Sequence, residues 1–257
     1  DDMQISFAFV SALEIKRSLG IRRGKNDAVD ALRIAEYAYI RRESISLSHK
    51  PSDVIFQLRA LLGERKQYVR MRAALLARKD ALHQYESKES IYRREEIIDK
   101  YAEYIASVDK QMRGLMEHDD EIKRNYELIS SVKGIGLVNA INTLVYTNNF
   151  TSFQTPRQYA CYCGIAPFEH TSGTSIKGRT AVSKMGNQQL KCELTMAARS
   201  AIIHDPWMKQ YYKRKMMSKG NAPGAHGIVL NAIKFKLIVR MFSVVKSGIP
   251  YKVMAYC

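Results

Sequence analysis

Residues 171–179, with the sequence TSGTSIKGR, bring two serines and two basic side chains together in a polar stretch that also contains glycine. A serine that attacks a phosphodiester must be exposed, must reach an in-line geometry, and needs cations nearby to stabilise charge on the phosphate. Ser172 is followed directly by a glycine, and Lys177 and Arg179 come next in the chain. Ser175 is a second candidate nucleophile. Attack on a nucleic-acid backbone is therefore one chemistry open to this stretch.

No adjacent base activates either serine. His170 lies two residues before Ser172 and is not in an obvious pairing position, while Lys184 continues the positive charge into the next segment. A loop that holds a phosphate without reacting needs only the same glycines and cations. From the residues alone, passive phosphate binding is the favoured interpretation.

A pair of carboxylates occurs in GKNDAVDA, residues 24–31. Asp27 and Asp30 are three residues apart at the start of an expected helix, so they share one face. Such a pair could bind Mg²⁺ for phosphodiester chemistry, and Lys25 beside it could contact a backbone phosphate. The spacing alone favours an ordinary helix start with a capping residue and a solvent-facing Asp, because a two-metal site needs further carboxylates.

The sequence VKGIGLVNA, residues 132–140, fits a helix-hairpin-helix pattern. Gly134 and Gly136 permit a tight turn, and backbone N–H groups at the following helix start can hold a DNA phosphate without reading its sequence. Lys133 adds charge at the same place. The alternative is an ordinary glycine turn between two helices; the overall charge of the chain favours phosphate binding.

A second basic segment, residues 208–220, interleaves Tyr211 and Tyr212 with lysine and arginine. Aromatic rings beside cations suit single-stranded nucleic acid or RNA, since bases stack on such rings. A solvated basic helix end explains the composition equally well, and both interpretations stay open.

Charge is the dominant property of the composition. The 257 residues include 41 Lys and Arg against 25 Asp and Glu, a formal net charge of +16. An excess of this size points to a polyanionic partner, of which nucleic acid is the first choice. No apolar run is long enough to span a bilayer, and no signal peptide opens the chain. We therefore expect a cytoplasmic protein without a membrane partner.

The cysteines do not form a recognisable metal or disulfide pattern. None of Cys161, Cys163, Cys192 and Cys257 is in a C-x-x-C pair, and no partner pair lies at zinc-ligand spacing. We interpret them as small buried hydrophobic residues in a reducing cytosol.

The hydrophobic pattern predicts a mainly helical chain with a residual α/β part. A β-prone run at residues 5–10 precedes a helix that begins near Asn26. Two long heptad patterns then fill residues 51–127, with Asp119 as the one polar exception, and predict either an antiparallel hairpin or a dimeric coiled coil. Residues 128–257 read as a compact α-rich domain with a loop at 171–179.

Several of these motifs, taken in order, resemble the DEDD insertion-sequence transposases of the IS110 family. The resemblance covers nearly the whole chain, is most specific at residues 128–200, and rests on this ordered set of segments: GKNDAVDALRIAEYA, SVKGIGLVNA, FTSFQTPRQYACYCGIAPFEHTSGTSIKGRTAVSKMGNQQLKCELTMAA and KSGIP. It implies a RuvC-like domain that ends near residue 50, a coiled coil at 51–127, and a helical transposase domain at 128–257.

The resemblance also implies a mechanism and partners. Ser172 matches the family's serine, which attacks DNA to form a transient 5′-phosphoserine link, and Asp27 and Asp30 match the last two of four Mg²⁺-binding carboxylates. Members are DNA recombinases that act on double-stranded donor and target DNA, and many are guided by a structured bridge RNA. We accordingly expect Lys177, Arg179 and Lys184 to hold phosphates, and a dimer or tetramer to assemble through the coiled coil near the nucleoid.

One departure from the family pattern concerns the start of the chain. The family's first Asp and its Glu belong to strands upstream of ISFAFV, and Asp1, Asp2 and Glu14 are not in matching motifs. We therefore expect a truncated RuvC-like domain, and metal-dependent activity only where those two carboxylates are supplied. The competing function classes are a non-catalytic nucleic-acid-binding protein and a Holliday-junction resolvase that uses the acidic site alone.

Overall fold

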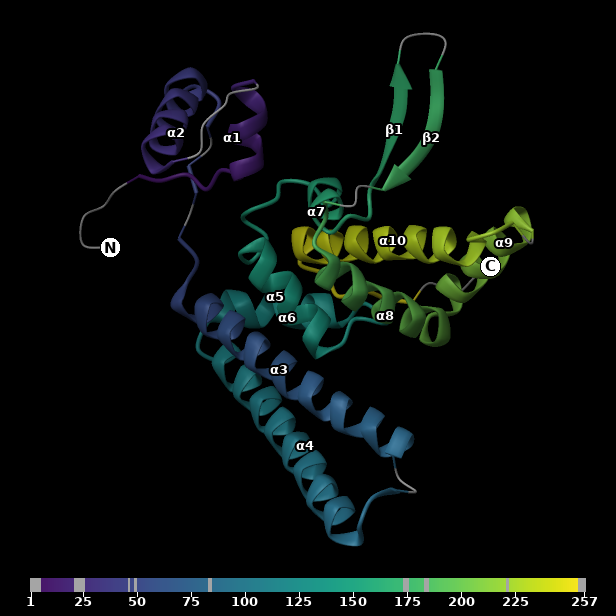
Figure 1. The fold of residues 1–257 in the computed structure, drawn as a ribbon. Coiled ribbons are helices and arrows are strands. Elements are labelled where there is room, and N and C mark those ends of the chain that lie inside the picture. The colour runs from purple at the N-terminus through teal and green to yellow at the C-terminus, as the bar shows by residue number, and fades with distance from the viewer. Residues whose placement is uncertain are drawn as a thin grey trace. The chain divides into compact units, whose positions relative to one another are not determined.

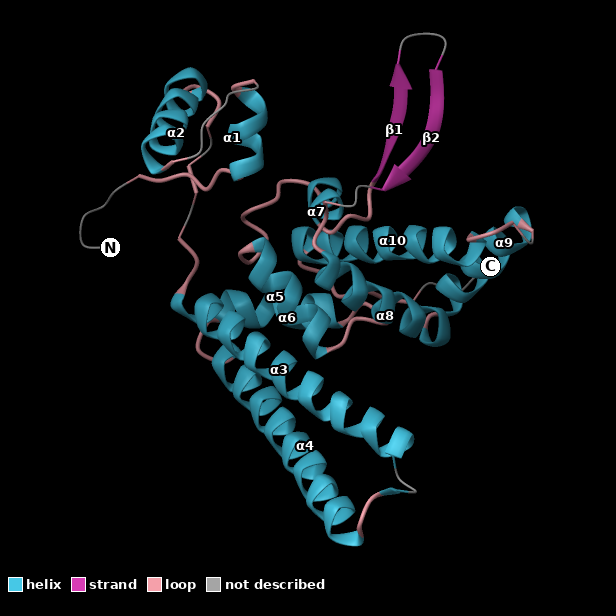
Figure 2. Cartoon of the chain, viewed as in Figure 1, coloured by secondary structure: helices cyan, strands magenta, loops and turns pink. Residues whose placement is uncertain are grey.

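Two compact units make up the chain, residues 1–50 and residues 51–257, and each is described by itself. The structure is a computed structural model (Figure 1). It describes residues 6–20, 26–45, 47–48, 50–82, 85–172, 176–182, 185–220 and 222–253, and within these it leaves the side chains of residues 78–82, 169–172 and 176–181 undescribed. Helices account for most of the described chain, and its two strands form one hairpin (Figure 2).

The first unit contains two helices, α1 (Ala12–Ser18) and α2 (Asp27–Arg41). Helix α2 begins where the sequence predicts, because the side chain of Asn26 accepts a hydrogen bond from the Val29 amide at 2.8 Å. The two helices are joined by the buried Tyr37, whose hydroxyl donates to Glu14 Oε1 at 2.6 Å.

The β-prone run at residues 5–10 forms no strand among the described residues 6–10. Their backbone bonds to Ser48 instead: the Ser48 amide donates to the Phe7 carbonyl, and the Phe9 amide donates to Ser48 Oγ, both at 2.9 Å. A β-prone run becomes a strand only when a second strand pairs with it. The RuvC-like identity of this unit stays a prediction.

The second unit begins with a long antiparallel helical hairpin of α3 (Asp53–Leu82) and α4 (Lys88–Met116), which lie side by side (Figure 1). Arg65 Nε donates to Asp109 Oδ1 at 2.6 Å, and the ring of Tyr68 lies 5.4 Å from that of Tyr104. The heptads therefore pack within one chain, which is the first of the two alternatives. Dimerisation through this hairpin stays a prediction.

Asp119 explains the polar exception in the second heptad. Helix α4 ends at Met116, and the Asp119 carboxylate accepts a hydrogen bond from the Ile122 amide at 3.0 Å, which caps α5 (Asp120–Ser130). Ile122 stays buried although the helix has restarted. The a/d pattern thus continues through a helix break that hydrophobic spacing alone does not reveal.

The remaining elements are α6 (Leu137–Thr147), α7 (Pro156–Tyr162), β1 (Pro167–Ser172), β2 (Ile176–Val182), α8 (Gln188–His204), α9 (Pro206–Lys219) and α10 (Ala225–Ser247). Helix α10 is central, because it packs against α5, α7, α8 and α9. Its residues Ile233, Leu237, Ile238 and Met241 are completely buried. The α-rich character predicted for residues 128–257 is confirmed.

One hydrophobic core runs from the base of the α3–α4 hairpin into this helical domain. Leu58 of α3 and Met112 of α4 are fully buried in the same cluster as Ile141 of α6 and Ile233 of α10. The boundary expected at residues 127 and 128 falls inside α5, and a separate coiled-coil domain stays a prediction. Across the described residues, no helix is both long and apolar enough to cross a membrane.

Asp205 joins three parts of the second unit. Its carboxylate is fully buried and caps α9 by accepting from the amides of Trp207 and Met208. The same carboxylate accepts from Arg240 Nη1 of α10 at 2.6 Å and from the Tyr251 hydroxyl at 3.0 Å. Four donors therefore satisfy a charge that would otherwise be costly to bury.

Asp205→Ala should lower the free energy of unfolding by about 3–5 kcal/mol, because it leaves the Arg240 guanidinium without its partner. Asp119→Ala is the matched control, since Asp119 caps a helix but forms no ion pair with any described residue, and should cost about 1 kcal/mol. Urea unfolding monitored by circular dichroism gives both values. Equal losses in the two variants would contradict a linking role for Asp205.

Candidate functional site

Ser172 is the last residue of β1 and pairs with Ile176 of β2, so its backbone lies at the distal end of the hairpin. Thr171 pairs with Lys177 one step closer to the base. The prediction of a loop over residues 171–179 is wrong for residues 171–172 and 176–179, because they form antiparallel strands. A polar sequence without alternating large hydrophobic residues carries little strand signal, while cross-strand backbone bonds stabilise the hairpin nonetheless.

A bulge interrupts the hairpin beside Arg179. Phe168 pairs with Ala181 and His170 with Gly178, so two residues of β2, Arg179 and Thr180, lie opposite a single residue of β1. Bulges bend a strand and increase its twist, and they recur next to active sites. The structure does not describe the side chains of Ser172, Lys177 and Arg179. It does not describe Lys25, Ser175 and Lys184 at all.

The base of the hairpin is held tightly to the helical domain. The Asn187 amide donates to the Tyr162 carbonyl at 2.8 Å, and Asn231 Nδ2 of α10 donates to the Ile165 carbonyl at 2.7 Å. Gly186 packs so closely on Gly164 that an added Cβ would be 2.2 Å from the Gly164 Cα. The two chain segments that enter and leave the hairpin are therefore fixed against α7 and α10.

The glycine turn between α5 and α6 divides its two glycines between different roles. Gly134 has a φ of 97°, and an added Cβ would lie 2.6 Å from the Ala197 carbonyl oxygen of α8. It is needed for close packing against α8. Gly136 is exposed and begins α6 without a side-chain cap, beside the exposed Lys133. Of the two glycines, Gly136 is the one that leaves its side of the turn open to a phosphate.

The acidic pair lies in the first turn of α2, where both carboxylates are exposed. Asp30 Oδ1 is 3.4 Å from Arg33 Nη1, an i,i+3 ion pair on the helix surface. Among the described residues no three His, Cys, Asp or Glu side chains come together as a metal-binding group. Two carboxylates are enough protein ligands for Mg²⁺, because water and substrate phosphates usually complete its octahedral shell.

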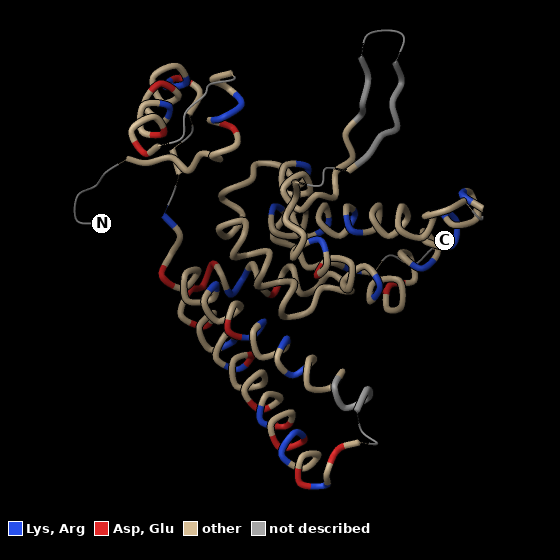
Figure 3. The backbone as a smooth tube through the Cα atoms, in the orientation of Figure 1, with Lys and Arg blue, Asp and Glu red and all other residues tan. Residues whose placement is uncertain are grey.

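The charged residues of helices α9 and α10 are all basic. The two helices contain five and four Lys or Arg residues, respectively, and no Asp or Glu (Figure 3). By contrast, α3 and α4 carry both acidic and basic residues. An excess of cations on the domain that carries the Ser172 hairpin suits a nucleic-acid surface.

Lys234 is a buried cation that sequence reasoning missed. Its side chain is only 6% exposed and donates to Thr195 Oγ1 of α8 at 3.0 Å, but the described residues provide it with no ion-pair partner. Burial lowers the pKa of Lys234, and the nearby Lys191 lowers it further, while Cys192 opposes them. The signal was present in the sequence: Lys234 follows Leu230 by four residues on the apolar face of α10.

The cysteines differ in their environments. Cys163 is fully buried, and burial raises the pKa of its thiol to about 12, so it stays protonated at neutral pH. Cys161 is half-buried and Cys192 is exposed, which makes the expectation of burial wrong for Cys192. Cys257 lies outside the described residues. Cys163 therefore acts as a small hydrophobic residue.

Two family models match the chain. One, described as the transposase IS116/IS110/IS902 family, matches residues 126–213, and these include the α5–α6 turn and the Ser172 hairpin. The other, a transposase model named for the DEDD proteins of IS110, matches residues 1–85 and includes Asp27 and Asp30. Together the two matches include the whole of the first unit and parts of the second.

Curated relatives agree with these matches. Pilin gene-inverting proteins of Moraxella bovis and Moraxella lacunata are each 28% identical over 235 residues, which is 91% of this chain and 70% of theirs. An uncharacterized 43.6 kDa protein of insertion element IS110 from Streptomyces coelicolor is 29% identical over 159 residues, 61% of this chain and 38% of its own.

Gly134→Ala should lower the free energy of unfolding by about 2 kcal/mol or more, because the new Cβ meets the α8 backbone and the left-handed φ is unfavourable for alanine. Gly136→Ala, the control two residues away, has open space around its Cβ and should cost about 1 kcal/mol or less. Thermal unfolding compares them. A larger loss for Gly136→Ala would refute the packing role of Gly134.

Lys234→Met should be as stable as the wild type or more stable at pH 7, because it removes a buried charge that has no acidic partner. The pKa of Lys234 is lower folded than unfolded, so wild-type stability should rise with pH between these two values, and the advantage of Lys234→Met should shrink as pH approaches 10.5. Urea unfolding at several pH values measures this. A large loss at pH 7 would show that the ammonium stabilises the fold.

Proposed function

Because the chain belongs to the IS110 family of transposases, we propose that it cuts and rejoins DNA at an insertion sequence with Ser172 as the nucleophile. The observation that carries the proposal is the position of Ser172. It lies at the end of a hairpin whose base is clamped to a basic helical domain, inside the segment that matches the transposase model. Such a projecting strand end can reach a DNA backbone while the domain holds its phosphates.

The proposed reaction is a pair of transesterifications. The Ser172 Oγ attacks a backbone phosphorus and gives up its proton, the bond to the 3′-oxygen breaks, and that oxygen leaves as a hydroxyl. The protein then carries a 5′-phosphoserine link. A 3′-hydroxyl from another strand attacks the same phosphorus, which rejoins DNA and restores the serine. Each step exchanges one phosphoester for another, so no external energy source is required.

Cations are required because negative charge increases on the attacked phosphate. Lys177 and Arg179 of β2 are the first lysine and arginine after Ser172 in the sequence, and Lys177 pairs with Thr171 across the hairpin. Lys184 follows the hairpin. We assign them to the phosphates on either side of the cleaved bond. Lys25, Lys133 and the backbone at Gly136 are proposed to hold phosphates farther from it, while Gly134 shapes the turn by packing against α8.

Asp27 and Asp30 would hold Mg²⁺ at the start of α2. The ion would supply positive charge against the transferring phosphate and would lower the energy of the leaving oxygen. The contribution of this chain is a pair of exposed carboxylates on one helix face, with Asn26 fixing the helix start. Both side chains are open to water and to a substrate phosphate.

The proposed partners follow from the family and the charge. Double-stranded donor and target DNA are the substrates, and a structured guide RNA would select them. The pilin gene-inverting proteins are named for the inversion of a gene, which itself requires DNA to be cut and rejoined. A second copy of the chain, bound through the α3–α4 hairpin, would bring two DNA sites together.

In a protein that also supplies the family's first Asp and its Glu, Ser172→Ala should abolish strand cleavage and exchange while DNA binding is retained, because only the attacking oxygen is lost. Ser175→Ala is the matched control from the same polar stretch and should keep its activity. Recombination of plasmid substrates and a denaturing gel for covalent protein–DNA adducts measure the two variants. Normal exchange by Ser172→Ala would eliminate the nucleophile assignment.

The same assay separates the competing function classes. A resolvase that uses the acidic site alone would lose activity in Asp27→Asn but not in Ser172→Ala, and would form no adduct. A non-catalytic binding protein would give neither cleavage nor adduct with any variant. The proposed mechanism instead requires both Asp27→Asn and Ser172→Ala to lose exchange.

A further inference from the structure

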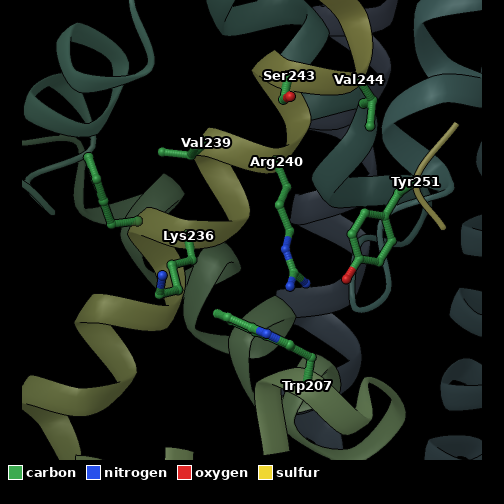
Figure 4. Close-up of a pocket in the computed structure, with 8 residues that line it drawn as sticks. Trp207, Lys236, Val239, Arg240, Ser243, Val244 and Tyr251 are labelled. Atoms are coloured by element: carbon green, nitrogen blue, oxygen red, sulfur yellow. The ribbon is translucent and has the colours of Figure 1, made fainter. Parts of the chain in front are cut away.

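A pocket of about 550 Å³ lies between α9, α10 and the segment after α10 (Figure 4). Trp207 lies at one side, the long side chains of Lys236 and Arg240 extend from α10 toward it, and the ring of Tyr251 lies beside Arg240. This volume is typical of sites that bind a small organic group. The hairpin and the α5–α6 turn contribute no residues to it.

The aromatic rings at the pocket form a ready stacking surface. Trp207 and Tyr211 are one turn apart on α9, and their rings are stacked at 5.5 Å with an interplanar angle of 8°. Trp207 and Tyr211 are partly exposed. Planar rings in parallel orientation are the arrangement on which an unpaired base can continue a stack.

Cations surround these rings. Lys236 Nζ lies 4.7 Å from the ring centre of Tyr211 and 5.0 Å from that of Trp207. Arg214 and Lys215 also lie over the Tyr211 ring, at 5.7 Å and 5.9 Å. Partial burial lowers the pKa of Lys236, as do the neighbouring charges of Arg240, Arg214 and Lys215. The cluster is therefore electrostatically strained by its own positive charge.

Asp205, the carboxylate that bonds to the pocket residues Arg240 and Tyr251, already has its full set of donors. Asp205 pairs with Arg240 and accepts from Tyr251 and from two amides of α9. In the described residues no carboxylate forms an ion pair with Lys236, Arg214 or Lys215. Three cations beside partly exposed rings thus have no carboxylate partner among the described residues, and a ligand that provides both an anion and a flat ring would match them.

We propose that this pocket and the adjoining face of α9 bind an unpaired nucleotide of single-stranded nucleic acid, with the base stacked at Trp207 and Tyr211 and the phosphate held by Lys236, Arg214 and Lys215. Duplex DNA keeps its bases inside the helix and cannot offer a base to the rings. Single-stranded segments of RNA or DNA can. The inference extends the proposed function, from which it takes only the expectation of a nucleic-acid partner, and it does not depend on Ser172.

Trp207 makes a direct test available, because it is the only tryptophan in the 257 residues. Twelve-nucleotide oligo(U) RNA, oligo(dT) DNA and duplex DNA are titrated into the full protein while the tryptophan fluorescence is recorded. Both single strands contain the predicted ligand and should quench Trp207, and the tighter of the two identifies RNA or DNA as the source. Heparin, an anionic polymer without bases, and the duplex should leave the fluorescence nearly unchanged. Free N-acetyltryptophanamide corrects for absorption by the oligonucleotides.

Matched variants on α10 then assign the effect to the pocket. Lys236→Gln should weaken the quenching affinity roughly fivefold or more and should lower the dependence of log affinity on log salt by about 0.7. Lys246→Gln removes an exposed lysine from the last turn of the same helix, outside the pocket, and should change the affinity less than about twofold. Circular dichroism confirms that both variants are folded.

Quenching by heparin or duplex equal to that by the single strands would overturn the proposal, as would equal losses in Lys236→Gln and Lys246→Gln, or no quenching by any oligonucleotide. Ser172→Ala protein is included to separate this inference from the catalytic mechanism. Its fluorescence should be quenched as in the wild type. A failed recombination experiment therefore does not contradict the pocket proposal, and a failed quenching experiment does not contradict the assignment of Ser172 as nucleophile.

Discussion

The buried carboxylate of Asp205 is the interaction on which the second unit depends. It caps α9, pairs with Arg240 in the middle of α10, and accepts from Tyr251 beyond the end of α10. The Tyr251 amide in turn donates at 2.7 Å to the Oγ of Ser131, the residue after α5. A single charge therefore sets the positions of α9, α10 and the end of α5, and the cost of burying it is offset only while all these elements stay together.

Helix α10 passes this constraint to two separate surfaces. Lys234 and Lys236 are two residues apart, so they project about 200° apart around the helix. Lys234 lies against α8, the helix that starts directly after the Ser172 hairpin, and Lys236 lies at the pocket beside Trp207. Asn231, one turn earlier, bonds to the entry of the hairpin. The helix that forms the centre of the core thus also places the hairpin and the basic pocket.

The sequence predicts the helices well and the special positions poorly. Long periodic segments such as α3, α4 and α10 repeat their apolar residues over many turns, so their type is clear. Residues 6–10 and the strands around Ser172 depend instead on which other backbone pairs with them, and this is not encoded in their own periodicity. The heptad position of Asp119 hides a helix restart because its neighbours remain apolar on both sides of the break.

Candidate site residues show the same limit. The i,i+3 spacing of Asp27 and Asp30 predicts a shared helix face, and both are in the first turn of α2. The spacing of Gly134 and Gly136 predicts a turn, but only tertiary structure shows that Gly134 faces α8. Lys234 is anomalous in the sequence as a lysine on an apolar face, yet its missing acidic partner becomes evident only when the packing of α8 and α10 is known.

The most direct test of the central claim is the identity of the residue that becomes attached to DNA. Protein trapped on a cleavable substrate is digested with nuclease and protease, and tandem mass spectrometry then locates the remaining nucleotide. The account predicts a 5′-phosphate ester on Ser172. A nucleotide on Ser175 or on a tyrosine, or cleaved DNA without any attached protein, would contradict it.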